Sequence, residues 1–385
     1  MTDTTSESQS AVDAALAALS ALHPKKIDLG LERIERVLKA LGNPHQNLPP
    51  VVHIAGTNGK GSTLSYVRAM AEAGGLKCHA YTSPHLVRFH ERIVLAGEMI
   101  SDEKLIDILA RVREANDGQP LSFFEATTAA AFLAFSETPA DLCLIEVGLG
   151  GRYDATNVID RPAVVGITPI DYDHAEFLGR YLAQIAREKA GIMKPFMPVC
   201  IGQQGDLVNA VLEAEGNKLG LRPRFLNQDF RAYRQHGRLV YEDEQQLLDL
   251  PLPALVGQHQ IMNAGLAIAM ARVLQFTDSA IEKGLKSVSW PARMQSLTTG
   301  AFADKVIAAG GELWLDGGHN PHAARAVASA MAELESKTER PLILVTGILA
   351  NKDIGGFLDA FEGLASAVIG VTIPGHTALA PETLI

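Results

Sequence analysis

The stretch VVHIAGTNGKGST, residues 51–63, joins a short apolar run to a glycine-rich turn and the start of a helix-like segment. The common phosphate-binding loop has four residues between its first glycine and a Gly-Lys-[Ser/Thr] triplet. Here only two residues separate Gly56 from Gly59, and a further glycine follows Lys60. Glycines let backbone N–H groups approach phosphate oxygens, and a helix N-terminus adds a positive dipole. We therefore predict a phosphate-binding loop in which Lys60 supplies a point charge and the Ser62 or Thr63 hydroxyl helps to hold a metal ion.

Short apolar runs alternate with helix-like segments along most of the chain. Several runs are continuously hydrophobic, as in strands that are covered on both faces. This alternation predicts an α/β fold: an N-terminal domain with a P-loop-type, mainly parallel sheet, and a smaller, Rossmann-like α/β C-terminal domain. The expected strands are Val51–Ala55, Leu142–Val147, Ala163–Thr168, Val199–Gly202, Glu312–Asp316, Leu342–Thr346 and Ala367–Thr372, and the expected helices are Ser62–Ala73, Asp102–Asn116, Glu125–Ser136, Leu182–Met193, Gln260–Leu274 and His322–Leu334.

One region departs from this alternation. Residues 225–253 show short polar-apolar alternation around His236-Gly237, which predicts a β-hairpin appended to the first domain. Trp290-Pro291 is the expected hinge between a larger first domain, residues 1–292, and a smaller second domain, residues 293–385. A further helix is expected to start in APETLI, residues 380–385.

Composition excludes several classes of protein. The 385 residues carry a formal net charge of −10 and a pI of about 5.7, which argues against a dedicated nucleic-acid binder. No apolar run reaches the ~18 residues of a membrane span, and the N-terminus lacks the pattern of a signal peptide. Three scattered cysteines fit a reducing compartment, and Cys143 is expected to pack as a small hydrophobe. We predict a cytoplasmic protein without nucleic-acid or membrane partners.

Five further positions are candidates for the chemistry. Glu146 ends an apolar strand, where a carboxylate is costly unless it is paired or bound to metal, and it is either a Walker-B-like ligand or an ion-paired loop residue. Ser83 is either an oxygen ligand for Mg²⁺ or a turn residue. A lone histidine such as His174 is usually structural, and a helix lysine such as Lys189 usually lies in solvent. The glycines after Glu146 open a loop that presents Asp154.

Taken together, the motifs resemble the folylpolyglutamate synthase/dihydrofolate synthase family, which is related to the Mur ligases. The resemblance covers nearly the whole chain, and GTNGKGS is the family's own variant of the phosphate loop. In order, the motifs are GTNGKGS, TSPHL-x-x-F-x-ERI, FFEATT, EVGLGGRYDATN, DH-x-x-FLG, REKAGI, HQ-x-x-NA, W-P-x-R-M and DGGHNP.

This resemblance implies a bifunctional, ATP-dependent ligase that adds L-glutamate to dihydropteroate and to reduced folates through an acyl phosphate. It implies ATP as co-substrate, two Mg²⁺ sites and a carbamylated Lys189. It also implies an ATPase and pterin-binding domain in residues 1–292 and a C-terminal glutamate-ligase domain in residues 293–385, which we expect to be truncated because family members continue with another helix and strand. We expect a monomer. The implied ATP-binding residues are Gly59, Lys60, Gly61, Ser62, Asn263, Arg293 and Asp316; the metal ligands are Ser83, Glu146, His174 and Lys189; the catalytic residues are Lys60, Lys189 and His319; and the pteroate-contacting residues are Phe123, Phe124, Glu125, Ala126, Tyr153, Asp154 and Ala155.

The chain also departs from the family pattern. Ala292 stands in the hinge where the family usually has glycine, and Tyr172 stands where leucine is commoner. Three alternatives remain open: a monofunctional folylpolyglutamate synthase, a Mur-type ligase, and an ATP-binding regulatory module without ligase activity. A Mur-type ligase would need an N-terminal UDP-binding domain, and only about fifty residues precede the loop. A regulatory module would not need two metal sites.

Overall fold

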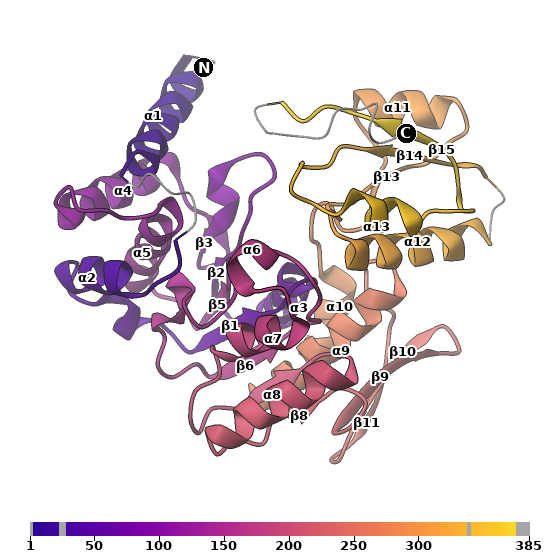
Figure 1. Ribbon diagram of the computed structural model, residues 1–385, viewed down its shortest axis with the longest axis horizontal. Coiled ribbons are helices and arrows are strands. Elements are labelled where there is room, and N and C mark those ends of the chain that lie inside the picture. Colours follow the sequence, from indigo (N-terminus) through magenta and orange to yellow (C-terminus); the bar gives the residue numbers. More distant parts are fainter. Residues whose placement is uncertain (1–2, 23–27, 337–339, 375–385) are drawn as a thin grey trace. The chain divides into compact units, whose positions relative to one another are not determined.

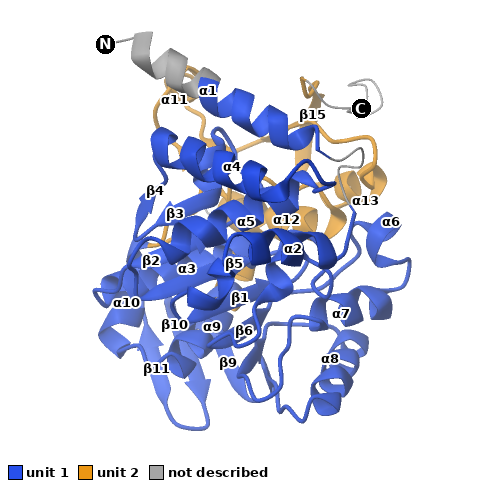
Figure 2. Cartoon of the chain, turned by 90° about the vertical axis from the view of Figure 1, so that its left-hand side faces the viewer, with its two compact units in different colours: residues 1–251, 263–287 blue, residues 252–262, 288–385 orange. Residues whose placement is uncertain are grey.

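The computed structural model describes residues 3–22, 28–336 and 340–374. The chain forms two compact units, which Figure 2 draws in different colours. Unit 1 comprises residues 1–251 and 263–287, and unit 2 comprises residues 252–262 and 288–385. The functional division at residue 292 stays a prediction, and the expected helix start at residues 380–385 lies outside the described residues.

Unit 1 is built on an eight-stranded sheet of order β4-β3-β2-β5-β1-β6-β7-β8. The six strands from β2 to β8 in this order are parallel, and the edge strands β3 and β4 are antiparallel. The mainly parallel sheet confirms the predicted fold class. The bounds are β1 Val51–Ala55, β2 Cys78–Tyr81, β3 Ile93–Leu95, β4 Glu98–Met99, β5 Leu142–Glu146, β6 Val164–Ile167, β7 Val199–Ile201 and β8 Arg224–Phe225.

Helices cover both faces of this sheet (Figure 1). On one face, the core cluster combines side chains of α1, α2, α4 and α5 with those of β1, β2 and β5. On the other face, Gly166 of β6 lies against Met270 of α9, because a Cβ there would meet the methionine sulfur at 2.7 Å. The bounds are α1 Asp3–Ser20, α2 Glu32–Ala40, α3 Lys60–Ala73, α4 Asp102–Asn116, α5 Phe123–Ser136, α6 Ala175–Leu178, α7 Leu182–Ala190, α8 Asp206–Lys218, α9 Gln258–Val273 and α10 Asp278–Ser287.

The predicted hairpin is present and gains a third strand. Strands β9 Phe230–Gln235 and β10 Arg238–Asp243 pair antiparallel, and β11 Leu247–Leu250 pairs with the other edge of β10. His236 and Gly237 form the turn with φ of 50° and 76°, the left-handed values that a tight hairpin turn requires. Short 3₁₀ segments complete the unit: η1 Pro44–Asn47, η2 Phe89–Arg92 and η3 Ala155–Val158.

Unit 2 contains two small sheets with helices. Strands β12 Gln295–Leu297 and β13 Leu313–Leu315 pair antiparallel, and β14 Leu342–Thr346 and β15 Ala365–Gly370 pair parallel. Helix α12 packs its buried alanines with Ile348, Phe357 and Phe361 in the core of this unit. The helix bounds are α11 Ala301–Ala308, α12 Pro321–Glu335 and α13 Ile354–Asp359.

Two features bear on later arguments. Cys78, Cys143 and Cys200 are free and buried in β2, β5 and β7, so Cys143 packs as the small hydrophobe that was predicted. No helix in the described part of the chain has the length and apolar character to cross a membrane.

Candidate active site

The predicted phosphate loop lies between β1 and α3. Gly56 and Gly59 have φ of 148° and 87°, and Gly59 caps the helix that begins at Lys60. The Thr57 N–H donates to the carbonyl of Pro169 at 2.9 Å, which fixes the loop to the segment after β6. β1, β2, β5 and β6 are parallel, so the segments that follow them meet at one edge of the sheet. Ligands of open α/β sheets bind at this edge.

Two lysines converge on one carbonyl of this loop. Lys189 Nζ donates to the Gly56 carbonyl oxygen at 2.8 Å, and Lys60 Nζ donates to the same oxygen at 3.3 Å. Lys60 also donates to the Thr57 carbonyl at 3.1 Å. The two lysines that were predicted as catalytic therefore lie together at the phosphate loop, although 129 positions separate them in the sequence.

Lys189 is a buried lysine, 5% exposed. Burial and, to a lesser extent, the neighbouring Lys60 charge lower its pKa to about 7, against the opposing effect of Asp173 and Asp154. Removal from water disfavours the charged form of an amine. At neutral pH a large fraction of this side chain is the neutral amine, which is the form that reacts with CO₂. The usual reading of a helix lysine as a solvated residue does not hold here.

Glu146 and Ser83 lie side by side at the edge of the sheet beside the phosphate loop. Glu146 is 5% exposed and is the register partner of Ile54 in β1. The Ser83 backbone N–H donates to its carboxylate at 3.3 Å. A buried carboxylate beside a serine hydroxyl supplies the oxygen donors that Mg²⁺ prefers, so these residues fit a magnesium site.

His174 is half-buried and stands at the start of α6, with φ of 51°. Its Nε2 lies 3.8 Å from Asp173 Oδ1, and Asp173 also acts electrostatically on Lys189. Among the described residues no group of three or more His, Cys, Asp and Glu side chains gathers as a metal site. The implied ligand set contains only two such side chains, Glu146 and His174, beside a serine and a modified lysine. The role of His174 stays a prediction.

The buried carboxylate of Asp154 fixes the conformation of the loop of residues 148–154 through hydrogen bonds. This carboxylate is 1% exposed and accepts hydrogen bonds from the Leu149 N–H at 2.8 Å, the Thr156 N–H at 3.0 Å and the Thr156 hydroxyl at 2.6 Å. Thr156 in turn contacts buried His53 Nε2 at 2.9 Å. Asp154 therefore shapes the loop, and the neighbouring Tyr153, which is half exposed, is free to meet a ligand.

The other segment predicted to contact the pteroate also contains both partly exposed and fully buried side chains. Phe123 and Phe124 are half-buried, and the Phe124 ring lies where any Cβ on Gly148 would stand, so the two segments adjoin. Glu125 is buried, accepts from the Ser122 N–H at 2.8 Å and pairs with Arg33 Nε at 3.0 Å. Ala126 and Ala155 are also buried. No sequence motif pointed to Arg33, because its partner lies 92 positions away.

The remaining predicted residues belong to both units. In unit 1, a Cβ on Gly59 would lie 2.6 Å from Asn263 Oδ1, so this amide borders the phosphate loop. In unit 2, Asp316 accepts from the Met294 and Gly318 N–H groups at 2.8 and 2.7 Å. Arg293 donates to the Ala292 carbonyl at 2.7 Å, and exposed His319 contacts the Gly317 carbonyl at 3.0 Å. These arrangements leave the ATP and catalytic roles as predictions.

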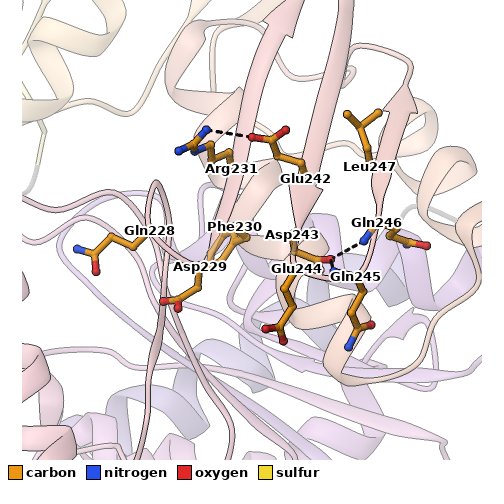
Figure 3. Close-up of a pocket in the computed structure, with 10 residues that line it drawn as sticks. All are labelled: Gln228, Asp229, Phe230, Arg231, Glu242, Asp243, Glu244, Gln245, Gln246 and Leu247. Atoms are coloured by element: carbon orange, nitrogen blue, oxygen red, sulfur yellow. Dashed lines mark hydrogen bonds and ion pairs between the residues drawn. The ribbon is translucent and has the colours of Figure 1, made fainter.

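A polar pocket lies elsewhere in unit 1, on the β9–β11 sheet (Figure 3). Its polar groups already pair with one another: the Arg231 side chain donates to Glu242 at 3.3 Å, and the Asp243 carboxylate accepts from the Gln245 backbone N–H at 3.0 Å. It contains none of the predicted site residues.

Comparison with known proteins agrees with this geometry. Residues 54–271 match the Mur ligase middle domain, and residues 304–384 match the Mur ligase glutamate ligase domain. The chain belongs to the Mur ligase family. The first match spans the phosphate loop, Glu146, His174 and Lys189, so the residues gathered at the sheet edge fall inside one family domain.

Among known proteins, the chain is similar to folylpolyglutamate synthases and dihydrofolate synthases. The folylpolyglutamate synthase of Lacticaseibacillus casei is 35% identical over 91% of this chain and 82% of its own length. The dihydrofolate synthase/folylpolyglutamate synthase of Escherichia coli is 34% identical over 89% of this chain and 77% of its own length. A solved structure, "E.coli FolC in complex with DHPP and ADP", has a TM-score of 0.88 at 31% identity and covers 97% of this chain and 86% of its own. The resemblance noted from the motifs is confirmed.

Proposed function

We propose that this protein is an ATP-dependent ligase that adds L-glutamate to dihydropteroate and to reduced folates. The observation that carries the proposal is the convergence of Lys60 and buried Lys189 on the Gly56 carbonyl, at the same sheet edge as Glu146. Amide ligation driven by ATP needs positive charge where phosphoryl oxygens gain negative charge, which Lys60 would supply directly and Lys189, as a carbamate, through a bound Mg²⁺. A regulatory nucleotide module has no need of a second, buried lysine at its phosphate loop.

The reaction has two steps. The substrate carboxylate attacks the γ-phosphate of ATP to give an acyl phosphate and ADP. The amine of L-glutamate then attacks the acyl carbon, and phosphate leaves through a tetrahedral intermediate. Backbone N–H groups from Gly59 to Ser62 would hold the phosphates, and Lys60 would neutralise the charge that develops on them. Half-exposed Tyr153 and half-buried Phe124 offer aromatic surface for the pterin ring.

The proposed metal set is Ser83, Glu146 and His174, with Lys189 as its carbamate at a second position. Bound Mg²⁺ would supply positive charge to the phosphoryl oxygens. Lys189 reacts as its neutral amine with CO₂, forming a new N–C bond and releasing a proton, and so becomes an oxygen ligand in place of a cation. The lowered pKa of Lys189 supports this modification, because its burial keeps a large neutral fraction at neutral pH.

The test is phosphate release by the purified protein with ATP, Mg²⁺ and each substrate alone or in combination. We expect release only when L-glutamate is present together with dihydropteroate or with a reduced folate. Release with L-glutamate and reduced folate, but not with L-glutamate and dihydropteroate, would identify a monofunctional folylpolyglutamate synthase. Nucleotide binding without release under any combination would contradict the ligase and favour a regulatory module.

The proposal includes a monomeric enzyme. Light scattering coupled to size-exclusion chromatography of the active protein tests this directly. A mass near 41.2 kDa for each active particle is expected for the 385 residues, and a stable multiple of that mass would contradict it.

A further inference from the structure

Asn157 connects two segments of the site through one side-chain nitrogen. It lies in η3 and is 6% exposed. Its Nδ2 donates to the Arg152 carbonyl at 2.9 Å and to the Gly191 carbonyl at 3.1 Å. Arg152 belongs to the loop of residues 148–154, and Gly191 caps the C-terminal end of α7. A single amide therefore holds that loop against the end of a helix.

The joint that Asn157 holds is tightly packed around Lys189. A Cβ on Gly151 would lie 2.9 Å from the Lys189 Cα, and the Arg152 N–H donates to the Glu188 carbonyl at 2.8 Å. On the other side, a Cβ on Gly191 would overlap the backbone of Arg152. The backbone that carries Lys189 is thus fixed by contacts with residues 151 and 152.

The other end of the Asn157 amide has no such role. Its Oδ1 is buried and accepts no hydrogen bond from the described residues. Burying a carbonyl oxygen without a hydrogen-bond donor lowers the free energy of unfolding, so general stabilisation of the fold does not explain an asparagine at this position. Its two N–H bonds to neighbouring segments are the contacts that an asparagine supplies here and a small apolar residue would not.

We propose that Asn157 is a positioning residue for Lys189. By holding the loop to the end of α7, it keeps Lys189 Nζ within 2.8 Å of the Gly56 carbonyl. Loss of the amide would release the end of α7, and the lysine would leave its place at the phosphate loop. The role in turnover rests on the proposed ligase function, whereas the structural link can be measured without it.

The main test is Asn157→Ala, which removes both donors. We expect kcat for ligation to fall by roughly ten- to a hundredfold, since a displacement of about 1 Å in an active site has this effect. The Mg²⁺ concentration for half-maximal activity should rise several-fold. Affinity for ADP without Mg²⁺ should stay within about twofold, because the phosphate loop keeps its own contacts. Hydrogen exchange of peptides covering residues 186–193 should become faster.

Gly191→Ala tests the same joint without touching Asn157, and should show the same pattern because its Cβ pushes against Arg152. Gly205→Ala is the matched control, since a Cβ there meets nothing within 4 Å, and it should behave as the wild type. If Asn157→Ala fails to fold, Gly191→Ala decides the question.

Two results would overturn the proposal: unchanged exchange at residues 186–193, or a lower unfolding midpoint with unchanged kcat and Mg²⁺ requirement for the folded fraction. Absence of ligation by the wild type would instead contradict the proposed function. Exchange and ADP affinity would then still decide whether Asn157 positions α7.

Discussion

At the scale of single residues, Lys60 lies folded over its own loop and bonded to the carbonyls of Gly56 and Thr57. Lys60→Ala should lower ligation by at least about a hundredfold, because it removes a cation from the place where phosphoryl charge develops. The unfolding midpoint should change little, since Lys60 is only half-buried. Steady-state kinetics with thermal unfolding measure both effects. The control is Lys286→Ala, which removes an exposed lysine paired with Glu282 and should leave turnover unchanged. Near-wild-type turnover in Lys60→Ala would contradict the phosphate-loop assignment.

Lys189 gives stability a pH dependence of definite sign. Its pKa is about 7 in the folded chain and near the usual 10.5 when unfolded, so the unfolded state binds more protons between these values. Burial of this lysine therefore lowers the free energy of unfolding by its full amount below pH 7, and the loss shrinks as the pH rises toward 10.5. Lys189→Met should be more stable than the wild type near pH 7 in CO₂-free buffer, with a difference that shrinks at higher pH. Urea unfolding at several pH values measures it, and a constant difference would contradict the lowered pKa.

At the scale of elements, the start of helix α5, which we propose contacts the pteroate, is held by a capping box. The Ser122 hydroxyl accepts from the Glu125 N–H, and the Glu125 carboxylate accepts from the Ser122 N–H. Ser122→Ala should lower the free energy of unfolding by about 1 kcal/mol, the usual effect of losing such a cap. Ser136→Ala, at the opposite end of the same helix, loses only a bond to the Leu133 carbonyl and should cost less. Equal losses in denaturant titrations would mean that the cap does not anchor the helix.

The elements that sequence patterns predicted are those with long or continuously apolar stretches. β1, β5, β6 and β7, and the helices α3, α4, α5, α7, α9 and α12, lie within a few residues of their expected bounds. β2 was missed because four residues with His79 among them give no apolar run. In the folded chain His79 is buried, bonds to the Thr138 carbonyl at 2.9 Å and stacks on Phe135. Only tertiary partners make this histidine compatible with a central strand.

The candidate site was predictable to a different degree. Local motifs identified the phosphate loop and Glu146, whose strand-end positions follow from the sequence. Nothing local showed that Lys189 is buried or that it reaches Gly56, since both facts depend on how α7 packs. Asn157 and Arg33 could not be found at all, because each acts through partners that are distant in the sequence or belong to the backbone.

At the scale of the whole molecule, the three cysteines are enclosed in the large sheet. Burial raises the pKa of Cys78 and Cys200 to about 12 and raises that of Cys143 as well. The thiolate is the reactive form, so all three should be inert in the folded protein. A colorimetric disulfide reagent should find no reactive thiol under native conditions and three after unfolding in guanidinium. A fast-reacting thiol in the native protein would contradict the burial of the sheet.

This inertness gives the natural chain a use as a spectroscopic scaffold. A single cysteine introduced on the surface of each compact unit would take maleimide fluorophores without removal of the native thiols. Energy transfer between the two dyes would then report the separation of the units through the nucleotide cycle, in an enzyme whose own sequence is otherwise unaltered. Because the native thiols do not react, spin labels or cross-linkers could likewise be attached at a chosen position, and every signal would come from the introduced cysteine.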